Sequence, residues 1–186
     1  MQVELYPGFS LQNREALRRR DVDLAFVALP FEGAESIEAP RYLRLGTIEL
    51  MVILPEGHPL ASLDQIPRTR LIEEEVVTWA RAINPAVIDH IHRSFFGTTA
   101  HPRLVEVGDT TQNTRVAEVT RRSVVAIGLA PEAEIRPPGV VYRPLEEPTP
   151  LVEYGVLWPD AHASPFVDTF VEVAREVMYG ASGAGR

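Results

Sequence analysis

The sequence predicts an α/β fold, in which the strands of a largely buried sheet alternate with helices. Short apolar runs at residues 22–27 and 104–107 have the length and composition of buried strands. The segments between such runs carry apolar residues at helical spacing, which is the pattern of crossover helices on a sheet. With 186 residues, of which 45% are hydrophobic, the chain can bury one large core or two smaller ones.

The first third of the chain is predicted to contain a strand, a helix and a second strand. Residues 3–6 are the expected first strand, and the hydroxyl of Ser10 can cap the helix that follows. The apolar run at 22–27 is the next strand. Residues 42–54 supply one or two more strands, which the turn residues Pro55-Glu56-Gly57 bring to an end.

The middle of the chain carries a strong helix signal. The amide of Asn84 can cap a helix, and Pro85 lies in its first turn, where the missing N–H costs nothing. Gly97 marks the end of this helix. The apolar residues between them share one broad face, so we expect the helix to pack against the sheet through Val87, Ile88, Ile91, Phe95 and Phe96.

The remaining segments continue the alternation of strands and helices. The strand at 104–107 leads into a helix that Asp109, Thr110 or Thr111 can cap. Further strands are expected at residues 124–127, 140–145 and 152–158.

The last helix is predicted to open at Ser164-Pro165. The tail at 180–186 consists mostly of small residues and is expected to fray. The helix is expected to bury an apolar stripe made of Phe166, Phe170, Ala174 and Val177.

Composition excludes several classes of function. The net charge is −8 and the sequence pI is about 5.2, so the domain as a whole would repel a phosphate backbone, and we expect no DNA binding by this chain alone. The absence of cysteine excludes disulfides, thiolate zinc sites and cysteine nucleophiles. There is no apolar stretch of membrane-spanning length and no secretory signal at the start, which favours a cytoplasmic location without membrane partners.

Catalytic, metal and cofactor sites are not predicted. His90 and His92 are two positions apart on a helix and point to different sides, unlike a metal pair, so no metal site is expected there. Asp89 beside His90, with Ser94 nearby, could suggest a nucleophile relay, but neighbours on a helix do not face each other, and a solvated helix face is the preferred interpretation. The three consecutive acids at Glu73-Glu74-Glu75 are typical of an exposed edge or loop. The glycines form no phosphate-binding loop, so neither a nucleotide nor another cofactor is expected.

Two groups of polar residues are candidates for ligand binding. In open α/β sheets, ligands bind outside the carboxyl ends of strands, where helix N-termini present unpaired N–H groups. Gly108-Asp109-Thr110-Thr111 follows one strand and starts a helix, so its amides and hydroxyls could hold a carboxylate. Thr78-Trp79 adds a hydroxyl and an aromatic wall. The alternatives are that the threonines and aspartate only cap helices and that the tryptophan belongs to the core.

Four short motifs, taken in order, resemble one known family. They are the strand near residue 3, the phrase at 21–26, His58-Pro59-Leu60-Ala61 directly behind the apolar run 50–55, and the stretch at 138–145. Together they resemble the effector-binding domain of LysR-type transcriptional regulators, from Gln2 to about Val177. The resemblance implies a ligand sensor and not an enzyme.

The resemblance also implies an architecture: two α/β lobes of the type 2 periplasmic-binding-protein class, joined by two crossover strands. The expected first lobe is 1–67 plus 154–186, and the second lobe is 68–153. A small organic effector, favoured to be a carboxylate, would bind between them. By position, the first lobe's side of the effector cleft would be lined by Ala28-Leu29-Pro30. The second lobe's side would be lined by Thr78-Trp79 and Gly108-Asp109-Thr110-Thr111, with Ile127-Gly128 at its floor.

Proteins of the family normally begin with a helix-turn-helix, which is followed by the first strand and helix of the sensor domain. The resemblance starts after all of these segments, so none of them is expected in this chain. The resemblance therefore implies an N-terminally truncated sensor that reaches DNA only through the missing helix-turn-helix and that could form a homo-oligomer. Two alternatives share the scaffold. One is the solute-binding protein of a transporter, and the other is a small-acid dehydratase, for which Asp109 has no evident acid–base partner nearby.

Overall fold

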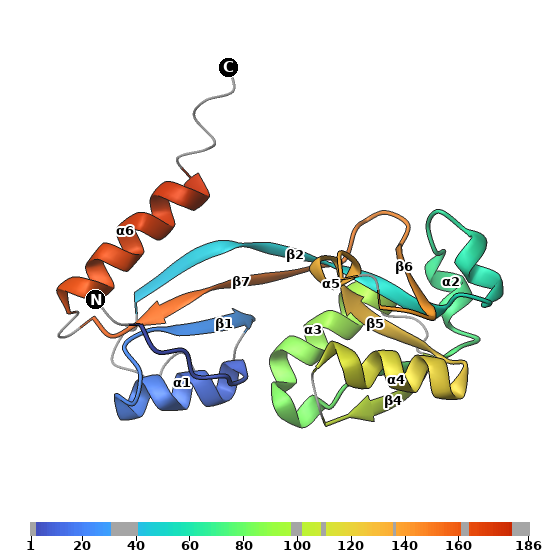
Figure 1. Ribbon diagram of the computed structural model, residues 1–186, viewed down its shortest axis with the longest axis horizontal. Coiled ribbons are helices and arrows are strands. Elements are labelled where there is room, and N and C mark those ends of the chain that lie inside the picture. The colour runs from blue at the N-terminus through green and yellow to red at the C-terminus, as the bar shows by residue number, and fades with distance from the viewer. Residues whose placement is uncertain are drawn as a thin grey trace, which may run out of the picture. The chain divides into compact units, whose positions relative to one another are not determined.

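The computed structural model describes residues 3–30, 41–97, 102–108, 111–135, 137–160 and 164–179. The chain divides into two compact units, one made of Met1–Thr47 with Glu153–Arg186 and the other of Ile48–Val152. It passes from one unit to the other within strands β2 (Arg41–Pro55) and β7 (Leu151–Trp158) (Figure 1). The expected boundary at residue 67 differs from this division, because the second half of β2 pairs with strands of the second unit.

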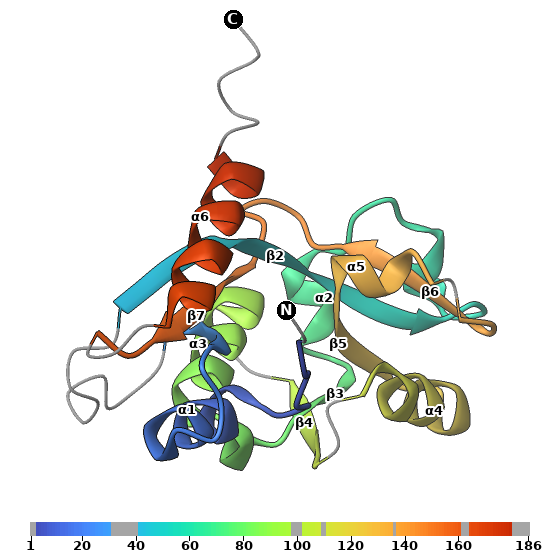
Figure 2. The same ribbon diagram turned by 60° about the vertical axis from the view of Figure 1, so that its left-hand side comes forward.

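The first unit contains helix α1 (Ser10–Arg19), strand β1 (Ala25–Leu29), the first part of β2, most of β7, and helix α6 (Pro165–Tyr179) (Figure 2). Strand β1 runs antiparallel to β7, and β7 lies between β1 and β2. The strand predicted at residues 3–6 is wrong, since these residues are irregular and pair with no described strand. A run of apolar residues forms a strand only when a partner supplies the ladder of hydrogen bonds.

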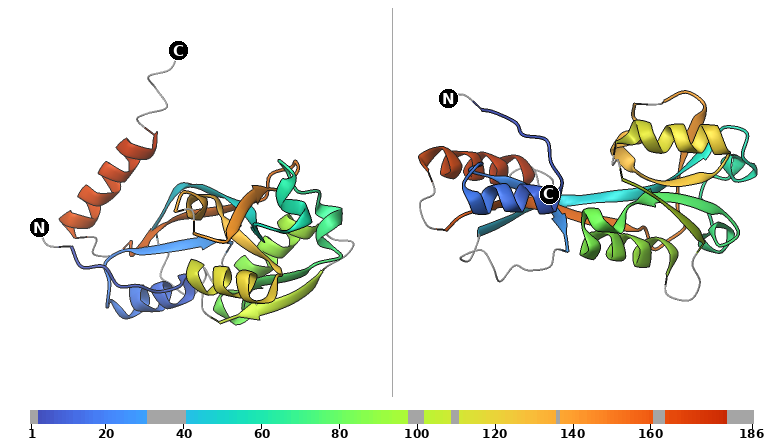
Figure 3. Two further views of the ribbon diagram at one scale, coloured as in Figure 1. Left: turned by 45° about the vertical axis from the view of Figure 1, so that its right-hand side comes forward. Right: turned by 90° about the horizontal axis from the view of Figure 1, so that it is seen from below.

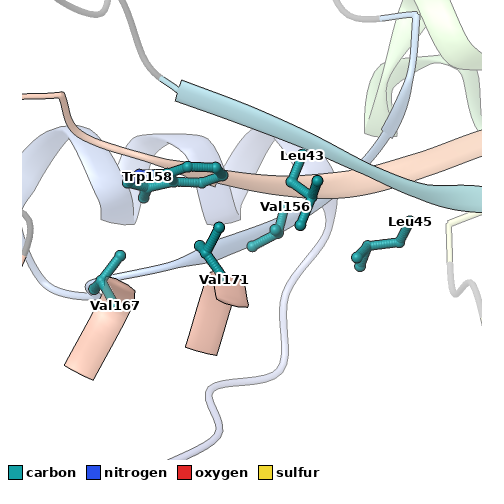
Figure 4. Packing of buried hydrophobic residues seen from close by; sticks show 6 residues of the cluster. All are labelled: Leu43, Leu45, Val156, Trp158, Val167 and Val171. Atoms are coloured by element: carbon teal, nitrogen blue, oxygen red, sulfur yellow. The ribbon is translucent and has the colours of Figure 1, made fainter. Parts of the chain in front are cut away.

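The sheet of the first unit has a small core on each side. Leu17 of α1 packs with Ala25, Val27 and Leu157. The other core joins the strands to α6, and Figure 4 shows the two valines of α6 directed at the residues of β2 and β7. Its buried members are Leu43, Leu45, Val156, Trp158, Val167 and Val171.

The stripe predicted for α6 is wrong in part. Ala174 is partly buried in the core, but Phe166 and Val177 are 63% and 67% exposed, and the helix buries Val167 and Val171 in their place. Two apolar stripes lie next to each other on this helix, at positions 166, 170, 173 and 177 and at positions 167, 171 and 174. The sheet buries the second of these stripes, while in the first stripe Phe170 contacts Phe26 of the edge strand β1.

The second unit has a mixed sheet in the order β6–β2–β5–β3–β4. Strands β3 (Glu75–Trp79), β4 (Arg103–Val107) and β5 (Val125–Leu129) run parallel. The long strand β2 is antiparallel to β5 on one side and to β6 (Val140–Pro144) on the other. Residues buried completely in this sheet include Ile53, Val77 and Ala126.

Helices α3 (Pro85–Phe96) and α4 (Gln112–Arg122) lie on opposite sides of the parallel strands (Figure 3). Helix α3 confirms the prediction: Asn84 is its N-cap, Pro85 is its first residue, and it ends at Gly97, where φ is 81°. Its predicted apolar face is buried in full. Short helical turns complete the unit: η2 (Pro59–Ser62), α2 (Arg68–Leu71), η3 (Arg81–Ile83) and α5 (Ala130–Ala133).

Across the described ranges, no helix combines the length and the apolar character needed to cross a membrane.

Candidate functional site

The carboxyl ends of three parallel strands meet at one edge of the second unit's sheet. Trp79 pairs with Val107 across β3 and β4, and Val77 pairs with Ala126 across β3 and β5. These registers place Thr78-Trp79, Gly108 and Ile127-Gly128 at the same edge, as the sequence predicted for residues that follow parallel strands. We refer to this edge below as the carboxyl edge.

Thr78 is completely buried at this edge and contacts a histidine. Its Oγ1 lies 2.9 Å from Nε2 of His92, which comes from α3. His92 also lies against Phe96, with 6.0 Å between the ring centroids. Sequence reasoning assigned no contact to His92, which the structure places against Thr78 and Phe96. Its spacing of four from both Ile88 and Phe96, two residues of the buried face, is the signal that could have revealed it.

Trp79 is also buried, with 6% of its surface exposed, and one face of its ring is covered by Arg115 of α4. The guanidinium carbon lies 4.5 Å from the ring centroid. Arg115 is completely buried and forms an ion pair with Glu132 of α5. Sequence reasoning missed Arg115, although its position four residues before the buried Val119 on the same helix face is a signal for burial.

The carboxylate of Glu132 connects α4, α5 and the end of β5. One of its oxygens pairs with Arg115, and the other accepts the backbone N–H of Leu129 at 3.0 Å. Gln112, the first residue of α4, donates to the carbonyl oxygen of Glu132 at 2.9 Å and to the hydroxyl of Tyr142 at 2.8 Å. Burial raises the pKa of Tyr142 above its ordinary value. These contacts fix the elements that surround Trp79.

The N-terminus of α4 forms the exposed part of the carboxyl edge. Thr111 is exposed and is the N-cap, with its Oγ1 accepting the N–H of Thr114 at 3.4 Å. Gly108 is exposed, and a Cβ at this position would meet no atom within 4 Å. Asp109 and Thr110, two of the predicted site residues, lie outside the described residues. The hydroxyl of Thr111 thus caps α4, and it also lies 3.2 Å from the hydroxyl of Thr114.

Ile127 and Gly128 are part of the sheet interior. Ile127 is completely buried. A Cβ on Gly128 would lie 2.7 Å from Cγ1 of Ile53 and 2.9 Å from Cε1 of Tyr142, so only glycine lets these neighbours pack so closely.

The remaining predicted site residues, Ala28-Leu29-Pro30, lie at the end of β1 in the first unit. The N–H of Ala28 donates to Oγ of Ser10 at 2.9 Å, so this serine ties α1 to β1. Ser10 is the first residue of α1, and Phe9 takes the N-cap position that the sequence assigned to the serine. Ala28 and Leu29 are half-buried and Pro30 is exposed.

The described part of the carboxyl edge contains few groups of the kind that perform catalysis or hold metals. Among the described residues, no group of three or more histidines, cysteines or acids could hold a metal ion. The hydroxyl–imidazole pair of Thr78 and His92 has the composition of a nucleophile and its base, but a side chain with no exposed surface cannot reach a substrate. Of the residues described at the carboxyl edge, Gly108 and Thr111 are exposed, while Thr78 and Trp79 are buried.

Comparison with known proteins identifies the family. Residues 1–179 match the family model described as the LysR substrate binding domain. No curated protein matches the chain.

Solved structures with the same fold include the BenM effector binding domain with its effector benzoate (20% identity, TM-score 0.79, covering 98% of this chain and 81% of that one). The reduced OxyR regulatory domain from Pseudomonas aeruginosa is similar at 19% identity and TM-score 0.72, covering 91% of this chain and 79% of that one. The chain also covers 58% of full-length BenM, with 97% of its own length matched, at 22% identity and TM-score 0.76.

These similarities confirm the predicted α/β fold of the type 2 periplasmic-binding-protein class. The chain belongs to the LysR substrate-binding domain family.

Proposed function

We propose that this chain senses a small organic acid for a LysR-type transcriptional regulator and binds that acid at the carboxyl edge. Family membership supports a ligand-sensing, regulatory role. Benzoate, the effector in the BenM structure, is itself a small organic acid. DNA contact is assigned to a helix-turn-helix of the regulator, because this domain carries a net charge of −8.

The observation that carries the proposal is the exposed N-terminus of α4 close to the buried Trp79, whose ring is covered by Arg115 of the same helix. Thr78 points to the other face of β3, where it contacts His92 of α3. The N–H groups of a first helical turn and a threonine hydroxyl are hydrogen-bond donors suited to a carboxylate. Gly108 leaves the approach to this turn open, because no side chain projects from it. Since the net charge repels anions at long range, the affinity for an acid has to come from these local donors.

An effector of this kind acts by population shift. It changes the output of a regulator only if it binds one conformation more tightly than another, and the difference in binding free energy sets the size of the response. The role of Ala28-Leu29-Pro30, at the end of β1 in the first unit, stays a prediction of the family resemblance.

Thr111 provides the test. Calorimetric titration of wild type with benzoate and a panel of aliphatic and aromatic acids identifies a binding acid, and Thr111→Val removes the exposed hydroxyl. Because a hydrogen bond to a charged group contributes about 1.5–3 kcal/mol, we expect the affinity to fall roughly tenfold or more. Thr111→Ser keeps the hydroxyl and restores binding. Thr120→Val, an exposed threonine near the other end of α4, is the matched control.

Two outcomes contradict the proposal. Equal affinities for Thr111→Val and Thr120→Val would remove the carboxyl edge from the binding site. Chemical conversion of a bound acid, detected by NMR spectroscopy of the mixture, would indicate an enzyme.

A further inference from the structure

Arg115 is the most deeply buried charged side chain of the described residues, and its surroundings define what it does. It has no exposed surface. A buried guanidinium is costly unless it is paired and hydrogen-bonded, so its position indicates specific partners. The partners include the Glu132 carboxylate, the Trp79 ring at 4.5 Å and the carbonyl oxygen of Thr111 at 3.5 Å.

These contacts join two parts of the proposed binding site. Trp79 is at the end of β3 and Thr111 is the N-cap of α4, and Arg115 contacts both. A cation over the face of an indole attracts the ring electrostatically and holds it in one orientation. At the same time, Glu132 supplies a negative charge directly beside the guanidinium, so little of its positive charge reaches a ligand.

We propose that Arg115 is a positioning residue for the effector site: it holds the indole of Trp79 against α4, and its charge is neutralised by Glu132. The effector's carboxylate is accordingly recognised by the α4 turn, and Arg115 sets the shape of the site without binding the anion. This inference rests on the proposed function, because it assigns a role within that site.

Trp79 reports on its own position through fluorescence. The chain contains two tryptophans, and Trp158→Phe leaves Trp79 as the only one. Trp158 lies in the core of the first unit, so the phenylalanine ring keeps most of the apolar packing there. In this background the emission maximum of Trp79 and its quenching by acrylamide, a neutral probe, and by iodide, an anionic probe, are measured without any effector.

Arg115→Lys and Glu132→Gln are the informative variants. Lysine keeps the charge but loses the planar group that stacks on the ring, so we expect a red shift of Trp79 emission and stronger quenching by both probes. Glu132→Gln leaves the guanidinium unneutralised, so quenching by iodide rises more than quenching by acrylamide. Arg121→Lys and Glu118→Gln alter an exposed ion pair on the same helix and serve as controls that leave both signals unchanged.

The same variants are titrated with benzoate and with benzamide, its neutral analogue. A positioning role predicts that Arg115→Lys weakens both by the same factor, roughly twofold to thirtyfold for the loss of one cation–π contact. If Arg115 bound the anion, Arg115→Lys would change the affinity for benzoate alone and Glu132→Gln would tighten benzoate binding.

Each outcome decides the proposal. Unchanged Trp79 emission and quenching in both Arg115→Lys and Glu132→Gln would overturn it, as would a change confined to benzoate. Altered Trp79 signals with unaltered benzoate affinity would also overturn it, because the indole would then lie outside the effector site. If wild type binds neither compound, the fluorescence arm still decides whether Arg115 positions Trp79, while the failure falls on the proposed function.

Discussion

The two units of this chain are built from the same kinds of elements but differ in how completely they cover their apolar residues. In the second unit, the large apolar side chains of α3 are buried, and Phe95 has no exposed surface. In the first unit, α6 exposes Phe166, Phe170 and Val177, and Phe26 of β1 is 48% exposed. Phe26 and Phe170 meet edge to face, with centroids 6.1 Å apart, so the exposed residues form a connected patch.

The comparison separates a unit whose core is closed from one that leaves apolar side chains open to solvent. The carboxyl edge belongs to the unit with the more completely covered core, and a rigid scaffold is what holds binding residues in a fixed geometry. Connected apolar surface of this kind is typical of regions that associate with other apolar surfaces, so we expect association at the first unit. The contrast predicts unequal responses to equivalent substitutions in the two units.

The largest expected difference is between Phe95→Ala and Phe166→Ala. Phe95 is fully buried in the second unit, so its truncation should lower the free energy of unfolding by about 3–5 kcal/mol. Phe166 is 63% exposed, so the same substitution should change it by about 0.5 kcal/mol or less. Urea denaturation followed by circular dichroism measures both values. Similar losses for the two variants would show that the patch on α6 is not open.

Glycine-to-alanine substitutions test how closely the backbone is packed in each of the two units. A Cβ on Gly155, in the first unit, would lie 2.5 Å from the carbonyl oxygen of Leu43 and 2.4 Å from a ring atom of Tyr42. A Cβ on Gly128, in the second unit, would meet only side-chain atoms at its three nearest contacts. Overpacking of this kind costs about 1–3 kcal/mol, and the clash with backbone should make Gly155→Ala the more damaging.

Gly108→Ala is the control for both glycines, since a Cβ there meets nothing within 4 Å. Its midpoint of thermal unfolding should stay close to that of wild type. Equal losses for all three variants would contradict the packing described for β5 and β7.

The apolar patch of the first unit predicts a smaller effect, on association and not on folding. Replacing Phe166 and Val177 with serine should reduce the fluorescence of a bound apolar dye and raise the concentration at which the chain begins to aggregate. The free energy of unfolding should change by only about 0.5 kcal/mol for each residue. Ile72→Ser, a 40% exposed residue of the second unit, is the control and should leave dye binding unchanged.

The smallest expected effect concerns the charges on α1. Hydrogen bonds from Arg18 and Arg19 lower the pKa of Glu15 from 4.5 to about 2. Because the folded pKa is the lower one, any stabilisation from Glu15 is present above pH 4.5 and is lost as the pH falls toward 2. In the double variant Arg18→Gln and Arg19→Gln, NMR titration should show the pKa of Glu15 rising. A pKa that stays near 2 would mean that these arginines do not cause the shift.

Local signals explain what the sequence predicted correctly. Helix α3 was predicted from Asn84, Pro85 and Gly97, each of which acts on the helix end where it lies. Thr78 and Gly108 were predicted to lie at one edge because each follows or ends a strand, and the carboxyl ends of parallel strands meet at the same edge of a sheet.

The errors involve partners distant in the sequence. Which apolar stripe of α6 is buried depends on the sheet it meets, and residues 3–6 form no strand because none of the described strands pairs with them. Arg115 was missed because its partners, Trp79 and Glu132, come from other elements.

An NMR titration of the isotope-labelled chain with benzoate and the strongest-binding acid of the panel would show whether the carboxyl edge of the second unit binds a small organic acid. We expect saturable shifts of the backbone amides of Trp79, Gly108 and Gln112 at the edge, with the amides of the α6 patch unmoved. Shifts centred on α6, or no saturable shift with any acid, would contradict it.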